Sequence, residues 1–136
     1  MQANLTYLSR GTLAQRSGVN LETIRYYEKI SLLPQPNRSE GGHRVYDEED
    51  LRRLSFIRRC REMGFSLKEI RGLLSLVDGE QISCKKVKGI ADEHLQDIRA
   101  KISDLKKIER TLSTLSASCS DEEVRECPII EALQLH

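Results

Sequence analysis

Three of the four cysteines are spaced so that their sulfur atoms could hold one soft metal ion. Cys119 and Cys127 enclose the polar segment SDEEVRE, and Cys84 lies 35 residues before the first of them. A thiolate is a strong ligand for soft metal ions, and it is also the group that oxidants attack. The spacing therefore predicts a metal site or a redox-sensitive thiol group, with three unrelated buried thiols as the plain alternative. We predict that the fourth, Cys60, is a small core residue.

The number of sulfur ligands restricts the choice of ion. A closed Zn(II) site normally has four ligands, and the loop between Cys119 and Cys127 contains no further Cys or His. Three sulfurs suit an ion of low coordination number such as Hg(II), with Cd(II) or Pb(II) next and Zn(II) as the remaining alternative. Cu(I), which two thiolates satisfy, would leave Cys84 without a role. The preferred prediction is Hg(II).

A long helix from Ser83 to about Ser116 must separate Cys84 from the other two ligands, since this stretch has no Pro and one Gly. At 1.5 Å per residue the separation is roughly 50 Å, so one chain cannot bring the three thiols together. In an antiparallel pair of such helices, however, Cys84 of one subunit meets Cys119 and Cys127 of its partner. A heptad-like apolar seam predicts this homodimeric coiled coil, and its positions are Ala91, Leu95, Ile98, Ile102, Leu105, Ile108, Leu112 and Leu115.

Composition places the chain among helical intracellular proteins. It has 136 residues, of which 38% are hydrophobic and 32% charged, and it has no Trp. The apolar fraction is low for a self-sufficient globule, so part of a helical surface needs a partner. Four cysteines are too few for a secreted disulfide scaffold, the N-terminus lacks the apolar core of a signal peptide, and no apolar run is long enough to span a membrane. We therefore expect a cytoplasmic protein with reduced thiols.

The near-neutral net charge of +1 conceals two regions of opposite sign. Residues 1–78 contain thirteen Lys and Arg, eleven of them Arg, against ten Asp and Glu. Residues 79–136 contain nine against eleven, and their last part is rich in Glu. Arginine is the cation best suited to phosphates and guanine edges, so the first region is the one expected to meet nucleic acid.

Two short helices at the start of the chain predict a helix-turn-helix. Ser9 can cap a helix that Gly18 ends, and Asn20 can cap a second helix over LETIRYYEKI. A tight Gly-containing turn between two such helices is typical of the DNA-binding motif, although ordinary helical hairpins share it. The second helix is therefore the candidate recognition helix.

The next segment predicts a small β-hairpin, or wing. Pro34 and Pro36 exclude a helix, Gly41-Gly42 permits a tight turn, and HRVY alternates like a short strand. Arg38, His43 and Arg44 flank the turn. A surface loop is the plain alternative, but basic residues gathered at such a tip favour contact with a nucleic-acid backbone.

Two more helices complete the first domain. Asp47 caps one that runs to about Met63 and ends at Gly64, and its predicted apolar side is Leu51, Leu54, Phe56, Ile57 and Cys60. Ser66 to Glu69 form a capping box that opens another helix to about Leu76. We predict a DNA-binding domain over 1–78, a dimerisation helix over 79–118, and a metal-binding loop with a short C-terminal helix over 119–136.

The ordered motifs ETIRYYE, R-x-x-x-G-x-R-x-Y and GFSL-x-EI, followed by a long helix and a Cys loop, closely resemble the MerR family of bacterial transcriptional regulators over the whole chain. DLKKIE before Cys119 and CPIIEAL after it are similar to the metal-responsive branch. Two features depart from the usual pattern. His43 stands where the family usually has an aromatic residue, and the Cys119–Cys127 loop is one residue shorter than in typical mercury regulators, equal to that of copper-responsive members, which generally have Ser at the position of Cys84.

The resemblance implies a mainly α protein and a role for each candidate residue. Thr23, Arg25 and Tyr26 of the second helix would meet DNA, and Arg38, Arg44 and Tyr46 of the wing would meet its backbone. Cys84 from one chain with Cys119 and Cys127 from the other would hold the metal. The family binds promoter DNA with and without metal, and the ion would change the shape of an overlong promoter spacer to reposition RNA polymerase.

Three other functions compete with this interpretation. A thiol redox sensor would use the same cysteines. An enzyme is disfavoured, because no Cys-x-x-Cys, no Ser/His/Asp set and no Glu beside a His-rich ligand pair is present. A passive metal buffer would not bind DNA.

Overall fold

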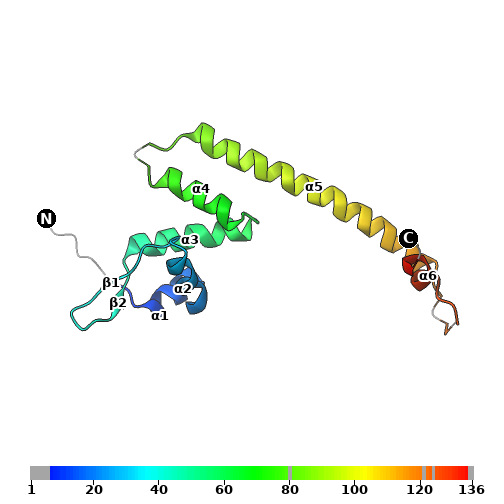
Figure 1. Cartoon of the computed structure of the whole chain (residues 1–136), viewed down its shortest axis with the longest axis horizontal. Helices are drawn as coiled ribbons and strands as arrows, with labels where there is room; N and C mark the ends of the chain where they lie inside the picture. Colours follow the sequence, from blue (N-terminus) through cyan, green and yellow to red (C-terminus); the bar gives the residue numbers. More distant parts are fainter. Residues whose placement is uncertain (1–6, 80, 121, 124, 135–136) are drawn as a thin grey trace. The chain divides into compact units, whose positions relative to one another are not determined.

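The computed structural model describes residues 7–79, 81–120, 122–123 and 125–134. Within these ranges the chain forms six α-helices and one two-stranded antiparallel sheet, in the order α1-α2-β1-β2-α3-α4-α5-α6 (Figure 1). The described residues fall into two compact units, one ending at Val87 and the other starting at Lys88. The protein is therefore mainly α, with an N-terminal helix-turn-helix domain and a long C-terminal helix, as the sequence predicts.

The helix-turn-helix consists of α1 (Arg10–Ser17) and α2 (Leu21–Lys29). The Ser9 side chain accepts a hydrogen bond from the Thr12 N–H, and Asn20 Oδ1 accepts one from the Thr23 N–H at 2.8 Å. Each cap satisfies a backbone donor that the first helical turn leaves without a partner. Gly18 ends α1 in the left-handed conformation, with φ at 73°. Both predicted caps and the glycine stop are confirmed.

Gly18 also allows a close approach by α3. A Cβ atom at this position would lie 2.5 Å from Arg58 Nη1, and that guanidinium donates to the Ser17 carbonyl at 3.2 Å. We expect Gly18→Ala to lower the free energy of unfolding by about 1–2 kcal/mol, because alanine resists positive φ and displaces Arg58 from its hydrogen bond. Urea unfolding measures this loss.

Gly11→Ala in the same helix is the matched control for that substitution. The nearest atom to a Cβ there, Ser9 Oγ, is 3.9 Å away. The urea midpoint of Gly11→Ala should stay at the wild-type value or rise, because alanine favours a helix more than glycine does. Equal midpoints for the two variants would contradict the role assigned to Gly18.

The predicted wing is confirmed as β1 (Asn37–Arg38) and β2 (Arg44–Val45), with Asn37 opposite Val45 and Arg38 opposite Arg44. Gly42 has φ at 80°, so the turn needs a glycine there. Beyond the sheet, Leu8 and Tyr46 form an isolated antiparallel bridge, which ties the base of the wing to the segment before α1. The hairpin loop projects away from the neighbouring helices (Figure 1).

The helices α3 (Glu48–Glu62) and α4 (Leu67–Val77) complete the domain, and both begin with a capping box. Phe56, predicted on the apolar side of α3, is half-buried and lines a hollow of about 330 Å³ with Pro34 and Val77 among others. The hydrophobic core takes side chains from every helix of the domain and from the connections between them; it consists of Leu8, Leu13, Val19, Ile24, Tyr27, Leu32, Leu33, Tyr46, Leu51, Leu54, Ile57, Cys60, Phe65, Ile70, Leu73 and Leu74.

Two arginines hold the connection between α2 and the wing. Arg53 Nε of α3 donates to the Leu32 carbonyl at 2.9 Å, and Arg71 of α4 donates to the Ile30 carbonyl at 2.6 Å. The same Arg53 pairs with Asp78, the C-cap of α4, at 2.8 Å and holds the pKa of that carboxyl below its usual value. The two arginine bonds to the Leu32 and Ile30 carbonyls satisfy backbone acceptors that lie between α2 and β1, and they fix where the wing begins.

The second unit contains most of α5 (Cys84–Ala117) and α6 (Pro128–Gln134). An apolar row runs along α5 and is open to solvent in the single chain, with Leu105 63% exposed and Leu112 56% exposed. Such a row on one helix is stable only when another apolar surface covers it. Among the described residues, no helix combines the length and apolar character needed to cross a membrane.

Candidate nucleic-acid interface and thiol pair

The recognition-helix candidate α2 has one buried and one exposed face. Ile24, Tyr27 and Glu28 point into the domain, whereas Arg25 is exposed, Tyr26 is 49% exposed and Thr23 is half-buried. The three residues predicted to contact DNA therefore lie outside the core, and Thr23 lies in the first turn beside the Asn20 cap. A helix N-terminus with exposed donors on one face is the part of such a motif that reaches base edges.

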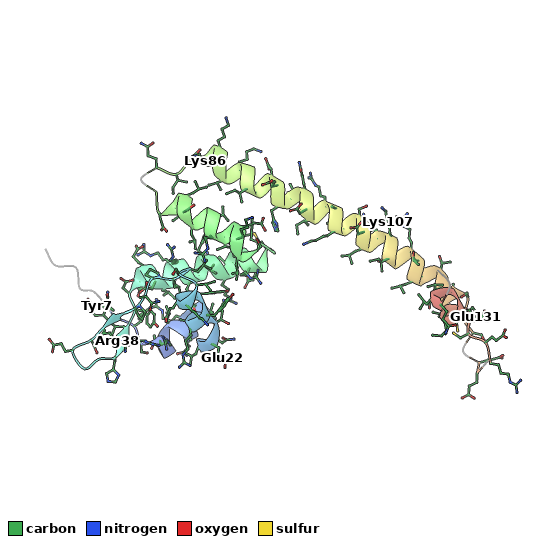
Figure 2. All side chains as sticks on the ribbon, viewed as in Figure 1. Tyr7, Glu22, Arg38, Lys86, Lys107 and Glu131 are labelled. Atoms are coloured by element: carbon green, nitrogen blue, oxygen red, sulfur yellow. The ribbon has the colours of Figure 1, made fainter. Side chains whose placement is uncertain are left out.

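The wing presents its basic residues around the turn. Arg38, His43 and Arg44 are all exposed, and Figure 2 shows Arg38 on this hairpin. The Arg38 guanidinium donates to the Gly42 carbonyl at 3.0 Å across the turn, so the cation is held beside the tip. Ser39 Oγ accepts the N–H of His43 at 3.2 Å and tightens the same loop. The arrangement suits contact with phosphates rather than reading of bases.

A hollow of about 510 Å³ lies between α2 and the wing. Its lining residues are Arg25, Glu28, Lys29, Gln35 and Arg44. Three cations from two separate elements therefore face one concave surface, which suits a phosphate backbone. Sequence reasoning missed Lys29 and Gln35. The four-residue spacing of Arg25 and Lys29 on one helix was a usable signal for the first, whereas Gln35 reaches the hollow only through the turn after α2.

Tyr46 differs from the predicted backbone contact. Its side chain is 2% exposed, and its hydroxyl donates to Glu28 and accepts from Arg10 Nε at 2.9 Å. Burial and the hydrogen bond to Glu28 raise the pKa of this phenol. A side chain that is enclosed and bonded in this way supports the wing from inside the domain.

The sulfur atoms of Cys119 and Cys127 lie 3.9 Å apart, and both cysteines are free thiols. Cys127 immediately precedes α6, where the N–H groups of Ile130 and Ile129 lower the pKa of its thiol. The hydrogen bond to Cys127 raises the pKa of Cys119. The pair therefore combines one thiol of lowered pKa with one of raised pKa, and both cysteines are half-buried.

This sulfur separation fits a shared ion. A disulfide would need about 2.05 Å. Two sulfurs at about 2.3 Å from one ion lie roughly 3.8–4.0 Å apart at tetrahedral or trigonal angles, and about 4.6 Å apart in a linear arrangement. The observed 3.9 Å is a thiol–thiol hydrogen-bond contact, and it is close to the separation of two sulfur ligands on one ion.

The other two cysteines occupy different environments. Cys84 is exposed at the first position of α5, and the helix runs unbroken from there to within two residues of Cys119. Within the described ranges, no group of three His, Cys, Asp or Glu side chains of the single chain could hold a metal ion. Cys60 is 4% exposed, and burial raises the pKa of its thiol, so its prediction as a core residue is confirmed.

Comparison with known proteins gives consistent results for both parts of the chain. The family described as MerR HTH family regulatory protein matches residues 8–77, and that described as MerR, DNA binding matches residues 51–115. A mercuric resistance operon regulatory protein of Bacillus cereus is 46% identical over 124 residues, covering 90% of this chain and 94% of the relative.

Two solved structures are similar over nearly their whole length. The transcription regulator PbrR691 from Ralstonia metallidurans CH34, in complex with lead(II), is 42% identical with a TM-score of 0.81, covering 93% of this chain and 98% of its own. The dual function transcriptional regulator MerR from Bacillus megaterium MB1, in complex with mercury(II), is also 42% identical, with a TM-score of 0.71. The match covers 90% of this chain and 95% of the Bacillus megaterium chain.

Proposed function

The chain belongs to the MerR family of DNA-binding transcriptional regulators, and from this premise we propose that it is a cytoplasmic Hg(II)-responsive regulator of a metal-resistance promoter. The protein represses without metal and activates when the ion binds. Residues 1–78 bind DNA, residues 79–118 form the dimer and residues 119–136 close over the metal. The observation that carries the proposal is the thiol pair at 3.9 Å in a chain of this family.

The metal site is completed by a second subunit. Cys119 and Cys127 supply two sulfurs, and Cys84 of the partner supplies the third. Two features support this arrangement: the close approach of the Cys119 and Cys127 sulfurs, and the apolar row of α5 that needs a covering helix. An antiparallel pair of α5 helices satisfies both, because it places the start of one helix beside the end of the other.

The choice of Hg(II) rests on ligand chemistry and on the relatives. Three thiolates without a fourth ligand favour a soft ion of low coordination number. The Bacillus megaterium relative was solved with mercury(II), whereas the similar Ralstonia protein was solved with lead(II). Pb(II) and Cd(II) are therefore the competing inducers, and Zn(II) would need another ligand.

The dimer reaches DNA through two copies of the interface described above. One α2 helix enters each major-groove half-site, through Thr23, Arg25 and Tyr26, and the wings meet the flanking phosphates through Arg38, His43 and Arg44. The protein occupies the promoter with and without the ion, together with RNA polymerase. Metal binding draws the Cys loop onto the partner and biases the dimer toward a state that changes the bend and twist of the DNA between the half-sites.

Metal competition with the wild type and with Cys84→Ser tests this proposal. We expect the wild type to prefer Hg(II) over Pb(II) and Cd(II), and Cys84→Ser to lose more than about 100-fold in Hg(II) affinity, since loss of a mere outer-shell partner already costs 10–100-fold. Lys85→Ala, next to Cys84 but without a sulfur, is the control and should bind as the wild type does. Unchanged Hg(II) affinity in Cys84→Ser would refute the three-thiolate site. A reversible Cys119–Cys127 disulfide after peroxide, with only weak metal binding, would favour the redox sensor.

A further inference from the structure

Three polar side chains, two of them buried and one half-buried, join α1, α2 and the wing beneath the DNA-binding side of the domain. Arg10 Nη2 donates to Glu28 Oε2 at 2.9 Å, and Arg10 Nε donates to the Tyr46 hydroxyl at 2.9 Å. Tyr46 in turn donates to the other oxygen of Glu28. The side chains of Arg10 and Glu28 are only 13% and 7% exposed. Each element thus contributes one member of a closed network.

The Arg10–Glu28–Tyr46 network is expected to add little to the free energy of unfolding. Removing a carboxylate and a guanidinium from water costs free energy that their attraction barely repays, and apolar residues of the same volume often serve stability as well. Directional hydrogen bonds, by contrast, define one relative position of the groups that they join. The Arg10–Glu28–Tyr46 network therefore defines how α2 and the wing lie relative to each other.

Neighbouring contacts extend this constraint to both ends of the wing segment. The Gln35 side chain donates to the Glu28 carbonyl at 3.1 Å, which ties the start of the wing segment to α2. At the other end, Leu8 and Tyr46 exchange backbone hydrogen bonds of 2.6 and 2.8 Å. Glu28 also lines the hollow that holds Arg25, Lys29 and Arg44. A shift of the wing would separate the cation of β2 from the two cations of α2.

We propose that Arg10, Glu28 and Tyr46 are positioning residues that set the wing against the recognition helix, so that Arg25, Lys29 and Arg44 engage the same stretch of DNA backbone. The inference rests on the assignment of α2 and the wing as the DNA-contacting elements. Arg10 also neutralises the Glu28 carboxylate, which would otherwise repel phosphate from the hollow.

Electrostatics and positioning predict opposite results for Glu28→Gln. Removing a negative charge near DNA should tighten binding if charge alone matters. A displaced wing should instead weaken binding to the preferred sequence and reduce the number of phosphate contacts. Glu48→Gln is the matched control, because Glu48 also pairs with an arginine of α1, Arg16, at 3.0 Å. Both of these side chains are more than 40% exposed, and their ion pair involves neither α2 nor the wing.

The experiment uses full-length dimers and two DNA probes: a duplex selected from a random library by the wild type, and a duplex of mixed sequence. Glu28→Gln and Tyr46→Phe should keep the helical circular dichroism signal and lose roughly ten-fold or more in affinity for the selected duplex. Their preference for it over the mixed duplex should fall. The slope of log affinity against log salt should drop by about one per lost phosphate contact. Glu48→Gln should bind at least as tightly as the wild type.

Each other outcome decides against the proposal in a different way. Folded variants with the wild-type preference and salt slope would make the network merely structural. Tighter binding by Glu28→Gln, equal to that of Glu48→Gln, would show that only charge matters. If even Tyr46→Phe, which keeps the buried ring, fails to fold, the network serves folding and the positioning role is refuted. A wild type that selects no duplex would overturn the assignment of the DNA interface itself.

Discussion

Mixing a Cys84→Ser chain with a chain that carries both Cys119→Ser and Cys127→Ser should restore one tight Hg(II) site per dimer, although neither variant alone has one. In the mixed dimer, one end joins the intact Cys84 of one chain to the intact thiol pair of the other. The opposite end carries only serines. A site confined to one chain would stay incomplete in every combination, so restoration identifies a site shared between subunits.

The expected size of this effect follows from ligand number. The pair alone offers only two sulfurs, so the Cys84→Ser homodimer should bind Hg(II) more than about 100-fold more weakly than the mixed dimer. Wild-type dimers should hold two ions and mixed dimers one. Co-expression with two affinity tags isolates the mixed dimer, native mass spectrometry counts the ions, and competition with a small thiol gives the affinity.

A mixed dimer of Cys84→Ser with a chain that lacks all three thiols is the negative control, because neither of its ends can be complete. Should that control bind as tightly as the test dimer, the Cys119–Cys127 pair suffices and Cys84 is no ligand. Should the test dimer bind no better than the two homodimers, the antiparallel arrangement is wrong.

Local signals explain why the helix boundaries of this chain could be predicted from its sequence. Ser9, Asn20, Asp47 and Ser66 each accept the backbone hydrogen bond that their position suggests. Such caps act within one helical turn, and therefore the residues that decide them are neighbours in the sequence. The same holds for the Gly42 turn of the wing.

Long-range packing set the limit of prediction at the DNA interface. Tyr46 follows β2 and stands two residues after exposed Arg44, a spacing that places both on one face of a regular strand, and its motif likewise led to a predicted DNA contact. Its partners Arg10 and Glu28 lie 36 and 18 residues away, and nothing in local spacing pairs three such residues. Gln35 likewise joins the hollow only because the chain turns back after α2. Tertiary contacts of this kind depend on where the helices pack, which no short motif encodes.

The seam of α5 can be tested by placing one charge in it. Leu105→Glu should convert the dimer to a monomer, because Leu105 is 63% exposed in the single chain and would be enclosed between two α5 helices in the dimer. Burying one leucine is worth about 1.5–3 kcal/mol, and a buried unpaired carboxylate adds a larger penalty. The substitution occurs twice in each dimer, so the effect is doubled.

Loss of the dimer should also remove most DNA affinity. Two half-sites bound by linked domains gain roughly 100- to 10,000-fold over one domain, and a monomer forfeits that gain. Sedimentation equilibrium gives the oligomeric state, and gel shift on a duplex selected by the wild type gives the affinity. Ser103→Glu introduces the same charge two residues earlier, about 200° around the helix from Leu105, and should leave both quantities unchanged. A Leu105→Glu protein that remains dimeric would place the subunit interface elsewhere, and the antiparallel helix pair that unites Cys84 with the thiols of the partner would lose its physical basis.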